Sequence, residues 1–536
     1  MSTWTIPPGM TGNDDLIRIG TGAAVDELFG CPSHLGVKVR PRVVPRRRPW
    51  TPRPELEGFL LRPVTDALDR VEHDGIDEEE ALAEVERSSP RLHPGLIEFT
   101  RRAVHGYLSA EVPDAGELVP VRDWWVISRP GERHWELFAW GRRYHSADGQ
   151  HREIRLARSS NPADEVKIAI AAHVAAFGRP ALWPRPWKEV FQTRTGPQVS
   201  YVRVVEVDLE GQRAEVRFQG TPTEAERYYA EHGRKRVAAI VAGGPEQPGP
   251  TCAQCKQLTS CGTLQRVPGV LGLTARPAPV RTVSVSDLRY YKTCPAQYHL
   301  RALKLPKSYE YSGEAELGQA VHAWLEEAHR GGRACDPAAM PTGKIPWTAG
   351  RWRVEGQLAK DGADMLRRHL EVCVFHQFEV PTEVRVEPRL AVHDTAAQAV
   401  VLAKPDMLYQ EDGGWVWREV KTTTSRRSRW YHDDLLDEFP QLALAVLFLA
   451  HGVLGGEVNS ARVELEVLRP RGAEIDVIDP TDPERVNKAR HVVQRMAEPW
   501  RADEAFEARP GRDCRGCPVS KWCPSFPGVD VSNEEE

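Results

Sequence analysis

One arrangement of cysteines occurs twice in this 536-residue chain, and it restricts the possible folds more than any other feature. Each occurrence is a lone Cys-Pro followed, far along the chain, by a triplet with the spacing Cys-x2-Cys-x5-Cys. The triplet begins 221 residues after the lone cysteine in the first set and 220 residues after it in the second. If the four thiols of a set act together, the fold must bring the two ends of each half into contact. The sets are Cys31, Cys252, Cys255 and Cys261, and Cys294, Cys514, Cys517 and Cys523.

Shorter similarities follow in the same order in both halves. The segment "RAVHGYLSAE" resembles "QAVHAWLEEA", "REIRLARSS" resembles "REVKTTTS", and "KIAIAAHVAAFG" resembles "QLALAVLFLAHG". Chance similarity would not preserve this order, so we interpret the chain as a tandem duplication. The expected divisions are a first domain at 1–265, a linker rich in Pro and Gly at 266–281, a second domain at 282–525 and a disordered acidic tail at 526–536.

The composition is that of a soluble globular protein, with 41% hydrophobic and 27% charged residues. No run of about 18 apolar residues is present, and the first residues lack the layout of a secretory signal, so we expect a cytoplasmic protein with no membrane segment. Clustered cysteines in that compartment are more often metal ligands than disulfides. The net charge of -5 means that any nucleic-acid surface must be a local basic patch.

Four thiolates in each half can bind a zinc ion or an iron–sulfur cluster. Zinc sites built from local knuckles usually pair two Cys-x2-Cys units, whereas here one ligand stands alone and three follow together at the end of the half. This division favours a [4Fe–4S] cluster that fastens the start of each domain to its end. Zinc, and thiols without any metal, are the alternatives. Cys335 and Cys373 lie outside the repeated pattern.

The second half has the pattern of an α/β protein. Apolar residues at helical spacing predict a helix at 313–330 and a second, more apolar helix at 438–452. The segment "EDGG" at 411–414 predicts a tight turn between two strands. The expected strands lie at 383–393, 399–410, 414–423 and 461–470.

Two acidic residues lie on the strands that this turn joins. Asp406 in "KPDMLY" and Glu419 in "REVK" can therefore approach one hard divalent cation, Mg²⁺ or Mn²⁺. Lys421 shares a strand face with Glu419, where its ammonium group can stabilise charge as a phosphodiester is attacked. His322 on the first helix can add a ligand, and Gln441 on the second can position phosphate or Lys421. Each residue alone is common on protein surfaces, whereas the ordered set is more specific.

This ordered set, Gly-x3-His, Pro-Asp, Glu-x-Lys and Gln between the cysteines, resembles the PD-(D/E)XK nuclease superfamily. The resemblance is to its iron–sulfur branch of RecB/AddB-type and CRISPR-adaptation exonucleases, and it covers 282–525 through motifs and 20–265 more weakly. It implies an α/β fold of two tandem restriction-endonuclease-like domains, each with a mixed central sheet flanked by helices. It also implies site residues: metal ligands His322, Asp406 and Glu419, the catalytic Lys421, and cluster ligands Cys294, Cys514, Cys517 and Cys523.

Two departures from the family pattern change what we expect. The family often has Gln-x3-Tyr on the last helix, but Gln441 is followed by Ala445, which puts the role of that helix in holding DNA in doubt. In the first half, His105 and Glu153 remain, but Arg155 takes the lysine position and "WGRRYH" offers no second acid. We therefore predict that the first half keeps a nuclease-like fold and its cluster, has lost catalysis, and binds phosphate through its added cations.

Two basic segments are candidate DNA contacts. "RPRVVPRRRPWTPRP" at 40–54 combines arginines with a tryptophan that can stack on a base, although a solvated loop explains it equally well. "TTTSRRSRWYH" at 422–432 directly follows the candidate active site. No phosphate-binding loop of an ATPase is present, so any unwinding requires a helicase partner. The arginines are Arg46, Arg47, Arg48, Arg426, Arg427 and Arg429.

The sequence thus predicts a Mg²⁺- or Mn²⁺-dependent deoxyribonuclease that acts on DNA ends or single strands and carries two [4Fe–4S] clusters. Cleavage is expected in the second half, and repair, recombination or phage defence is the expected setting by analogy. The alternative is a non-catalytic DNA-binding or scaffold subunit of a helicase–nuclease complex. RNA as the substrate, and exonuclease against endonuclease action, stay open from the sequence.

Overall fold

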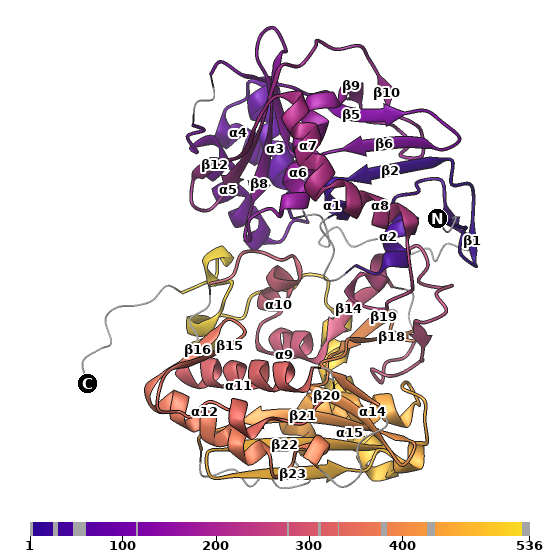
Figure 1. Cartoon of the computed structure of the whole chain (residues 1–536), viewed down its shortest axis with the longest axis vertical. Coiled ribbons are helices and arrows are strands. Elements are labelled where there is room, and N and C mark those ends of the chain that lie inside the picture. The colour runs from indigo at the N-terminus through magenta and orange to yellow at the C-terminus, as the bar shows by residue number, and fades with distance from the viewer. Residues whose placement is uncertain are drawn as a thin grey trace. The chain divides into compact units, whose positions relative to one another are not determined.

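The computed structural model describes residues 4–24, 30–46, 60–89, 91–113, 116–275, 278–308, 312–330, 332–376, 383–425 and 435–527 (Figure 1). Contacts divide the chain into two compact units. The first unit comprises residues 1–264, 294–308 and 504–536, and the second comprises 265–293 and 309–503. A division at the linker 266–281 follows the sequence repeat, whereas these units follow the packing of the chain.

The second unit contains a five-stranded mixed sheet in the order β17-β20-β21-β22-β23. All neighbouring strands are antiparallel except β21 and β22, which are parallel and are connected through helix α14. Helix α11 precedes the sheet in the chain. These elements are β17 (Val384–Val386), β20 (Met407–Glu411), β21 (Gly414–Thr422), β22 (Arg462–Arg469), β23 (Gly472–Ile478), α11 (Gly313–His329) and α14 (Pro440–Ala450).

The first unit contains a five-stranded sheet with the same plan, in the order β4-β7-β8-β11-β12. Here too one neighbouring pair is parallel, β8 with β11, and a helix, α6, connects its strands. Helix α5 stands before the sheet as α11 does in the second unit. The elements are β4 (Val119–Pro120), β7 (Arg142–His145), β8 (His151–Arg158), β11 (Tyr201–Asp208), β12 (Arg213–Gly220), α5 (Pro94–Leu108) and α6 (Glu165–Phe177).

Each unit also has a second mixed sheet, which we call the smaller sheet because fewer residues take part in it. The strand orders are β10-β9-β5-β6-β2 and β13-β18-β19-β14. In both, a parallel pair (β2 with β6, β14 with β19) adjoins an antiparallel hairpin (β5–β6, β18–β19). The strands are β2 (Leu16–Gly20), β5 (Trp124–Arg129), β6 (His134–Phe138), β9 (Arg179–Leu182), β10 (Gln192–Thr193), β13 (Gln265–Arg266), β14 (Arg281–Ser284), β18 (Leu390–Asp394) and β19 (Ala399–Ala403).

The remaining helices and short strands cover these sheets or connect them (Figure 1). In the first unit they are β1 (Met10–Thr11), β3 (Val44–Pro45), α1 (Thr21–Ala24), α2 (Pro32–Lys38), α3 (Arg62–Asp69), α4 (Glu78–Ser88), α7 (Pro222–His232), α8 (Arg234–Ala242) and α10 (Pro295–Ala302). In the second they are α9 (Val285–Thr293), β15 (Trp347–Ala349), β16 (Trp352–Val354), α12 (Gly356–His369), α13 (Leu435–Glu438) and α15 (Pro483–Ala502).

Helices cover both faces of the larger sheet in the second unit. Val420 of β21 packs in a buried cluster with Leu317 of α11 and Met365 of α12. Trp417 lies three residues before Val420 and so points to the opposite face, where its ring meets Phe448 of α14 edge-on at 5.8 Å. Helix α14 is apolar on every side because it is buried on every side, from Leu442 to Leu449.

Residues from the end of the chain complete the core of the first unit. Leu300 and Trp522 are fully buried in a cluster with Phe99 of α5 and Val207 of β11. The rings of Phe99 and Trp522 lie 5.2 Å apart, edge to face. Over the described residues, no helix is long and apolar enough to cross a membrane.

Candidate active site and cysteine sites

A tight hairpin in the second unit positions the two predicted acids. Asp412 and Gly413 adopt positive φ angles of 50° and 75°, which suits a two-residue turn and fixes the register of β20 against β21. Met407 pairs with Arg418, so Asp406, one residue earlier, lies across from Glu419. The Val420 amide donates a 2.7 Å hydrogen bond to Asp406 Oδ2, which fixes the carboxylate at the end of the hairpin.

Glu419 and Lys421 lie on the same face of β21. Glu419 is 7% exposed, and the indole Nε1 of Trp417 donates a 3.0 Å hydrogen bond to its Oε1. Lys421 Nζ lies 3.9 Å from Glu419 Oε2 and keeps partial contact with solvent. The amine is therefore next to the buried carboxylate and still reachable from outside.

Helix α11 brings the predicted histidine to this carboxylate pair. A Cβ atom at Gly318 would lie 3.0 Å from Thr422 Oγ1, so the glycine permits the close approach of α11 to β21. His322 lies one helical turn further on and points the same way. Its Nδ1 lies 3.1 Å from Asp406 Oδ1. The Gly-x3-His spacing thus places the glycine where α11 approaches β21 and the histidine beside Asp406.

The electrostatics of the group favour a bound cation. Burial, reinforced by the charge of Asp406, raises the pKa of Glu419 to about 7. Burial alone would also raise the pKa of Asp406, but the charge and hydrogen bond of His322 lower it overall. Burial opposes protonation of His322, yet Asp406 raises the pKa of that imidazole. A buried carboxylate, a half-buried carboxylate and an imidazole converge here, a donor set that suits Mg²⁺ or Mn²⁺.

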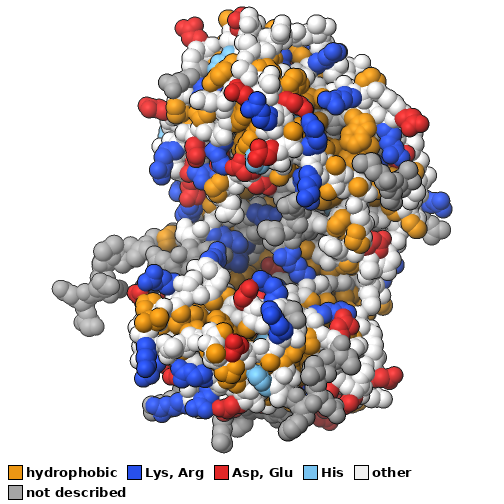
Figure 2. Space-filling model, in the orientation of Figure 1, with side chains coloured by type: hydrophobic (Ala, Val, Ile, Leu, Met, Phe, Trp, Pro, Cys, Tyr) orange, Lys and Arg blue, Asp and Glu red, His pale blue; other side chains and the backbone are white. Residues whose placement is uncertain are grey.

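The other predicted site residues of both halves are only partly described. Gln441 lies half-buried in the first turn of α14, and Ala445 is fully buried in the same helix. Arg46 is exposed, and its amide donates to the Gly9 carbonyl. Figure 2 shows basic and acidic side chains interspersed on the visible face. Arg47, Arg48, Arg426, Arg427 and Arg429 lie outside the described residues.

The corresponding site of the first unit is filled by arginine. Tyr144 of β7 pairs with Glu153 of β8, so it occupies the place that Asp406 has across from Glu419. Arg155 Nε lies 2.6 Å from Glu153 Oε1, and Arg203 Nη1 lies 3.3 Å from Oε2. With two guanidinium groups on Glu153 and a tyrosine in the place of Asp406, this position does not offer the ligands of a divalent metal.

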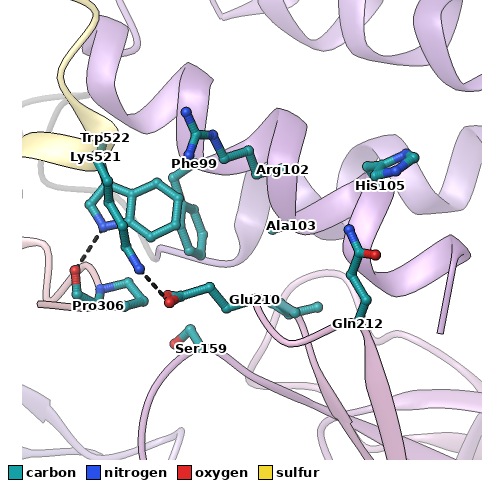
Figure 3. Close-up of a pocket in the computed structure, with 11 residues that line it drawn as sticks. Phe99, Arg102, Ala103, His105, Ser159, Glu210, Gln212, Pro306, Lys521 and Trp522 are labelled. Atoms are coloured by element: carbon teal, nitrogen blue, oxygen red, sulfur yellow. Dashed lines mark hydrogen bonds and ion pairs between the residues drawn. The ribbon is translucent and has the colours of Figure 1, made fainter. Parts of the chain in front are cut away.

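His105 of α5 is exposed, with Nδ1 3.4 Å from Glu78 Oε1. It lines a pocket of about 180 Å³ in the first unit together with residues of the chain's end (Figure 3). Lys521 in this pocket forms an ion pair with Glu210, and Arg102 pairs with Glu98 at 2.6 Å. These carboxylates offset both cations, so the pocket presents little net positive charge to a phosphate.

The four cysteines of the first set line one small pocket. Burial, with the added charges of Cys252, Cys31 and Cys261, raises the pKa of Cys255 to about 12, which shows how near the thiols lie. The Gln247 and Gly249 amides donate 3.2 Å hydrogen bonds to Cys31 Sγ and Cys252 Sγ. Buried thiols that receive amide N–H groups suit bound, deprotonated sulfur.

The second set repeats this arrangement. The Arg509 and Gly511 amides donate 3.4 Å hydrogen bonds to Cys294 Sγ and Cys514 Sγ, from the same distances in sequence before the triplet as in the first set. Burial raises the pKa of Cys517, and the nearby charges of Cys294, Cys523 and Cys514 add to the effect. Both sets belong to the first compact unit.

A further group was missed from the sequence. Cys335 and Cys373, outside the repeated pattern, lie beside His329 and His369 in the second unit. The signal in the sequence is the spacing His-x5-Cys after one helix and His-x3-Cys after the next. These two pairs are far apart in the chain, and only the packing of α11 on α12 brings them together.

Comparisons with known proteins bear on the second half. Residues 282–524 match the family model of the PD-(D/E)XK nuclease superfamily. None of the curated proteins matches the chain. A candidate exonuclease from Eubacterium rectale is 14% identical over 42% of this chain and 82% of its own, with a TM-score of 0.29. The protein SSO0001 is 15% identical over 45% of this chain and 85% of its own, with a TM-score of 0.22. The family match and the mixed sheets flanked by helices agree with the predicted restriction-endonuclease-like α/β fold.

Proposed function

We propose that this chain is a metal-dependent DNA nuclease whose active site lies in the region matching the PD-(D/E)XK superfamily. The observation that carries the proposal is the convergence of Asp406 and Glu419 across one hairpin. His322 lies 3.1 Å from the first carboxylate and Lys421 lies 3.9 Å from the second. This set can hold a divalent cation and present a positive charge beside it, as phosphodiester hydrolysis requires.

Each residue of the candidate active site has a separate proposed role. Asp406, Glu419 and His322 would hold Mg²⁺ or Mn²⁺, which supplies Lewis-acid stabilisation of the phosphate and a nucleophilic water at neutral pH. The Val420 amide and the Trp417 indole fix the orientation of the two carboxylates. Lys421 is placed to stabilise the negative charge that grows on the phosphate during attack. Gln441, at the start of α14, is the proposed contact for phosphate or for Lys421.

We further propose that each four-cysteine set holds a [4Fe–4S] cluster. The shared pattern of amide donors to sulfur supports a bound metal centre in both sets. Anaerobically purified protein should be brown and contain about eight iron and eight sulfide per chain. A colourless preparation with one zinc ion in each set would replace this proposal with a pair of zinc sites.

The first half is proposed to be a duplicated nuclease domain without catalysis. The identical strand order of the two larger sheets supports the duplication, and the arginines on Glu153 support the loss of metal binding. Its proposed role is to hold DNA or to support the second half. The proposed substrates are DNA ends or single strands in the cytoplasm. The proposed setting is repair, recombination or phage defence, with a helicase as partner.

Cleavage by purified protein tests the proposal directly. End-labelled single- and double-stranded DNA, and RNA of the same sequence, are incubated with the protein and Mg²⁺ or Mn²⁺. Degradation that Asp406→Asn abolishes and Lys421→Ala strongly reduces supports the assignment. Equal degradation by wild type and variants would place the activity elsewhere, and binding of DNA without any cleavage would favour the scaffold subunit.

A further inference from the structure

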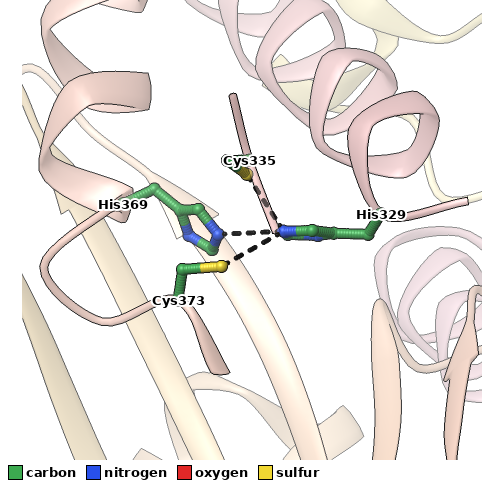
Figure 4. Close-up of side chains that lie close together, drawn as sticks. All are labelled: His329, Cys335, His369 and Cys373. Atoms are coloured by element: carbon green, nitrogen blue, oxygen red, sulfur yellow. Dashed lines mark hydrogen bonds between the residues drawn. The ribbon is translucent and has the colours of Figure 1, made fainter. Parts of the chain in front are cut away.

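Four buried side chains meet where helices α11 and α12 end in the second unit (Figure 4). His329 is the last residue of α11, and His369 is the last residue of α12. Cys335 and Cys373 follow these helices, after five and three intervening residues. None of the four is more than 2% exposed. The group is separate from the two repeated cysteine sets, which belong to the other compact unit.

Three of the four groups lie within 3.5 Å of the fourth, at its ring nitrogen. Cys335 Sγ, Cys373 Sγ and His369 Nε2 lie 3.1, 3.5 and 3.4 Å from His329 Nε2. A ring nitrogen either donates one proton or accepts one hydrogen bond, so it satisfies only one of these three neighbours. Hydrogen bonds of Cys373 with Cys335 and with His369 pair some of these groups, but they leave His329 Nε2 with more close neighbours than it can bond. A cation at the centre, bound by all four atoms, accounts for the whole group.

The distances fit tetrahedral coordination. Zinc lies about 2.0–2.1 Å from histidine nitrogen and about 2.3 Å from cysteine sulfur. In a tetrahedral site these bond lengths separate two nitrogens by about 3.3 Å and a nitrogen from a sulfur by about 3.6 Å. The 3.4 Å between His329 Nε2 and His369 Nε2 and the 3.5 Å to Cys373 Sγ are close to these values, whereas the 3.1 Å to Cys335 Sγ is shorter. All four ligand atoms lie within 4.8 Å of one another.

Neighbouring groups hold the ligands in orientation. Glu466 of β22 is fully buried, and its Oε1 lies 2.5 Å from His369 Nδ1, which directs Nε2 toward the centre of the group. A carboxylate behind a ligating histidine is the usual support in zinc sites. His376 Nε2 lies 3.1 Å from the Cys335 carbonyl oxygen and steadies the segment that carries this thiol.

We propose that His329, Cys335, His369 and Cys373 form a structural Zn²⁺ site. Two thiolates and two imidazoles select a borderline-soft ion over Mg²⁺, and four protein ligands leave no open position for a reaction. The ion ties the end of α11 to the end of α12. Because α11 also carries His322 two turns earlier, and Glu466 pairs with Val420 in the sheet, the zinc site braces the scaffold of the candidate active site.

Metal analysis of the full-length protein tests the site independently of any nuclease activity. Protein is produced with zinc in the medium, purified anaerobically without metal-affinity resin and washed with EDTA. We expect about one zinc per chain by mass spectrometry. The double variant C335S/C373S should contain less than about 0.2 zinc, while Cys514→Ser should keep its zinc and lose iron. Loss of zinc in the Cys514→Ser variant would overturn the proposal. Absence of zinc from the wild-type protein would overturn it too.

X-ray absorption at the zinc edge of the wild type covers the case in which the double variant does not fold. The site predicts two sulfur neighbours at about 2.3 Å and two nitrogen neighbours at about 2.0 Å. Four sulfur neighbours would assign the zinc to the repeated cysteine sets and overturn the proposal. A disulfide between Cys335 and Cys373 would overturn it as well. It would appear as two fewer free thiols when the thiols of the denatured protein are counted.

Discussion

The same substitution at two corresponding positions should have opposite consequences. Glu419 on β21 and Glu153 on β8 occupy equivalent places in the two larger sheets, each across from the neighbouring hairpin strand. Replacing either with glutamine keeps the size of the side chain, removes its charge and exchanges one acceptor oxygen for an NH2 group. We expect Glu419→Gln to stabilise the metal-free protein and abolish cleavage, and Glu153→Gln to destabilise the protein and leave the chemistry of cleavage intact.

The size of the first effect follows from the burial of Glu419. Its pKa rises from 4.5 in the unfolded chain to about 7 in the folded state, because burial and Asp406 disfavour the charge. Each pKa unit corresponds to about 1.36 kcal/mol, so ionisation of Glu419 costs the fold roughly 3 kcal/mol above pH 7. The folded state binds the proton more tightly, so this cost is absent below pH 4.5 and grows as the pH rises toward 7. Glutamine carries no charge at any of these pH values, so Glu419→Gln avoids this cost.

The second effect follows from the ion pairs of Glu153. This carboxylate is fully buried, Arg203 beside it is 2% exposed, and Arg155 is mostly buried as well. Removing the charge takes away the carboxylate that both guanidinium groups contact, at 2.6 and 3.3 Å. Removing one partner of a buried ion pair typically lowers the free energy of unfolding by about 3–5 kcal/mol. We expect a loss of about 3 kcal/mol here because Arg155 keeps some contact with solvent.

Hydrogen exchange followed by mass spectrometry measures both effects locally. In EDTA at pH 8, peptides of β21 should exchange more slowly in Glu419→Gln, and peptides of β8 should exchange faster in Glu153→Gln. At pH 4.5 the first difference should vanish. Added Mg²⁺ should protect β21 in the wild type but not in Glu419→Gln. Faster exchange of β21 in Glu419→Gln, or an unchanged β8 in Glu153→Gln, would refute the electrostatic reasoning.

Three further results are expected. Lys421→Ala should lower the cleavage rate roughly 10²–10³-fold while DNA affinity, measured by fluorescence anisotropy in Ca²⁺, stays within about threefold; a parallel loss of binding would assign the lysine to DNA contact instead. Gly318→Val should push α11 from Thr422 and cut cleavage about tenfold, and adding Thr422→Ala should restore most of it; no rescue would mean that this contact does not place His322. Cys517→Ser and Cys255→Ser should each reduce iron from about eight to about four per chain; unchanged iron in either variant would remove that cysteine from the cluster ligands.

The hairpin at the candidate site was predictable because its signals are local. An Asp-Gly pair sets the turn, the alternation of a strand places Glu419 and Lys421 on one face, and Gly-x3-His spans one helical turn. The helix expected at 313–330 is α11, and the strands expected at 414–423 and 461–470 are β21 and β22. Each of these features depends on neighbours within a few residues.

Features set by distant packing were not predictable in the same way. The strand expected at 399–410 is interrupted at "KPD", so β19 joins the smaller sheet and β20 joins the larger one. The segment 383–393 divides into β17 and β18 in the same manner. No local pattern shows that a proline ends one strand and that the chain then changes sheets. The meeting of His329 with Cys373 likewise depends on how two helices pack.

The core of the first unit has a consequence for how the protein is made. Phe99 near the beginning of the chain is buried against Trp522 near its end, with Leu300 and Val519 in the same cluster. During synthesis the ribosome releases the early segment hundreds of residues before its packing partners exist. The core of the first unit therefore stays incomplete until Val519 and Trp522 have been made. A premature stop codon before Val519 would damage a core whose first residues were made much earlier.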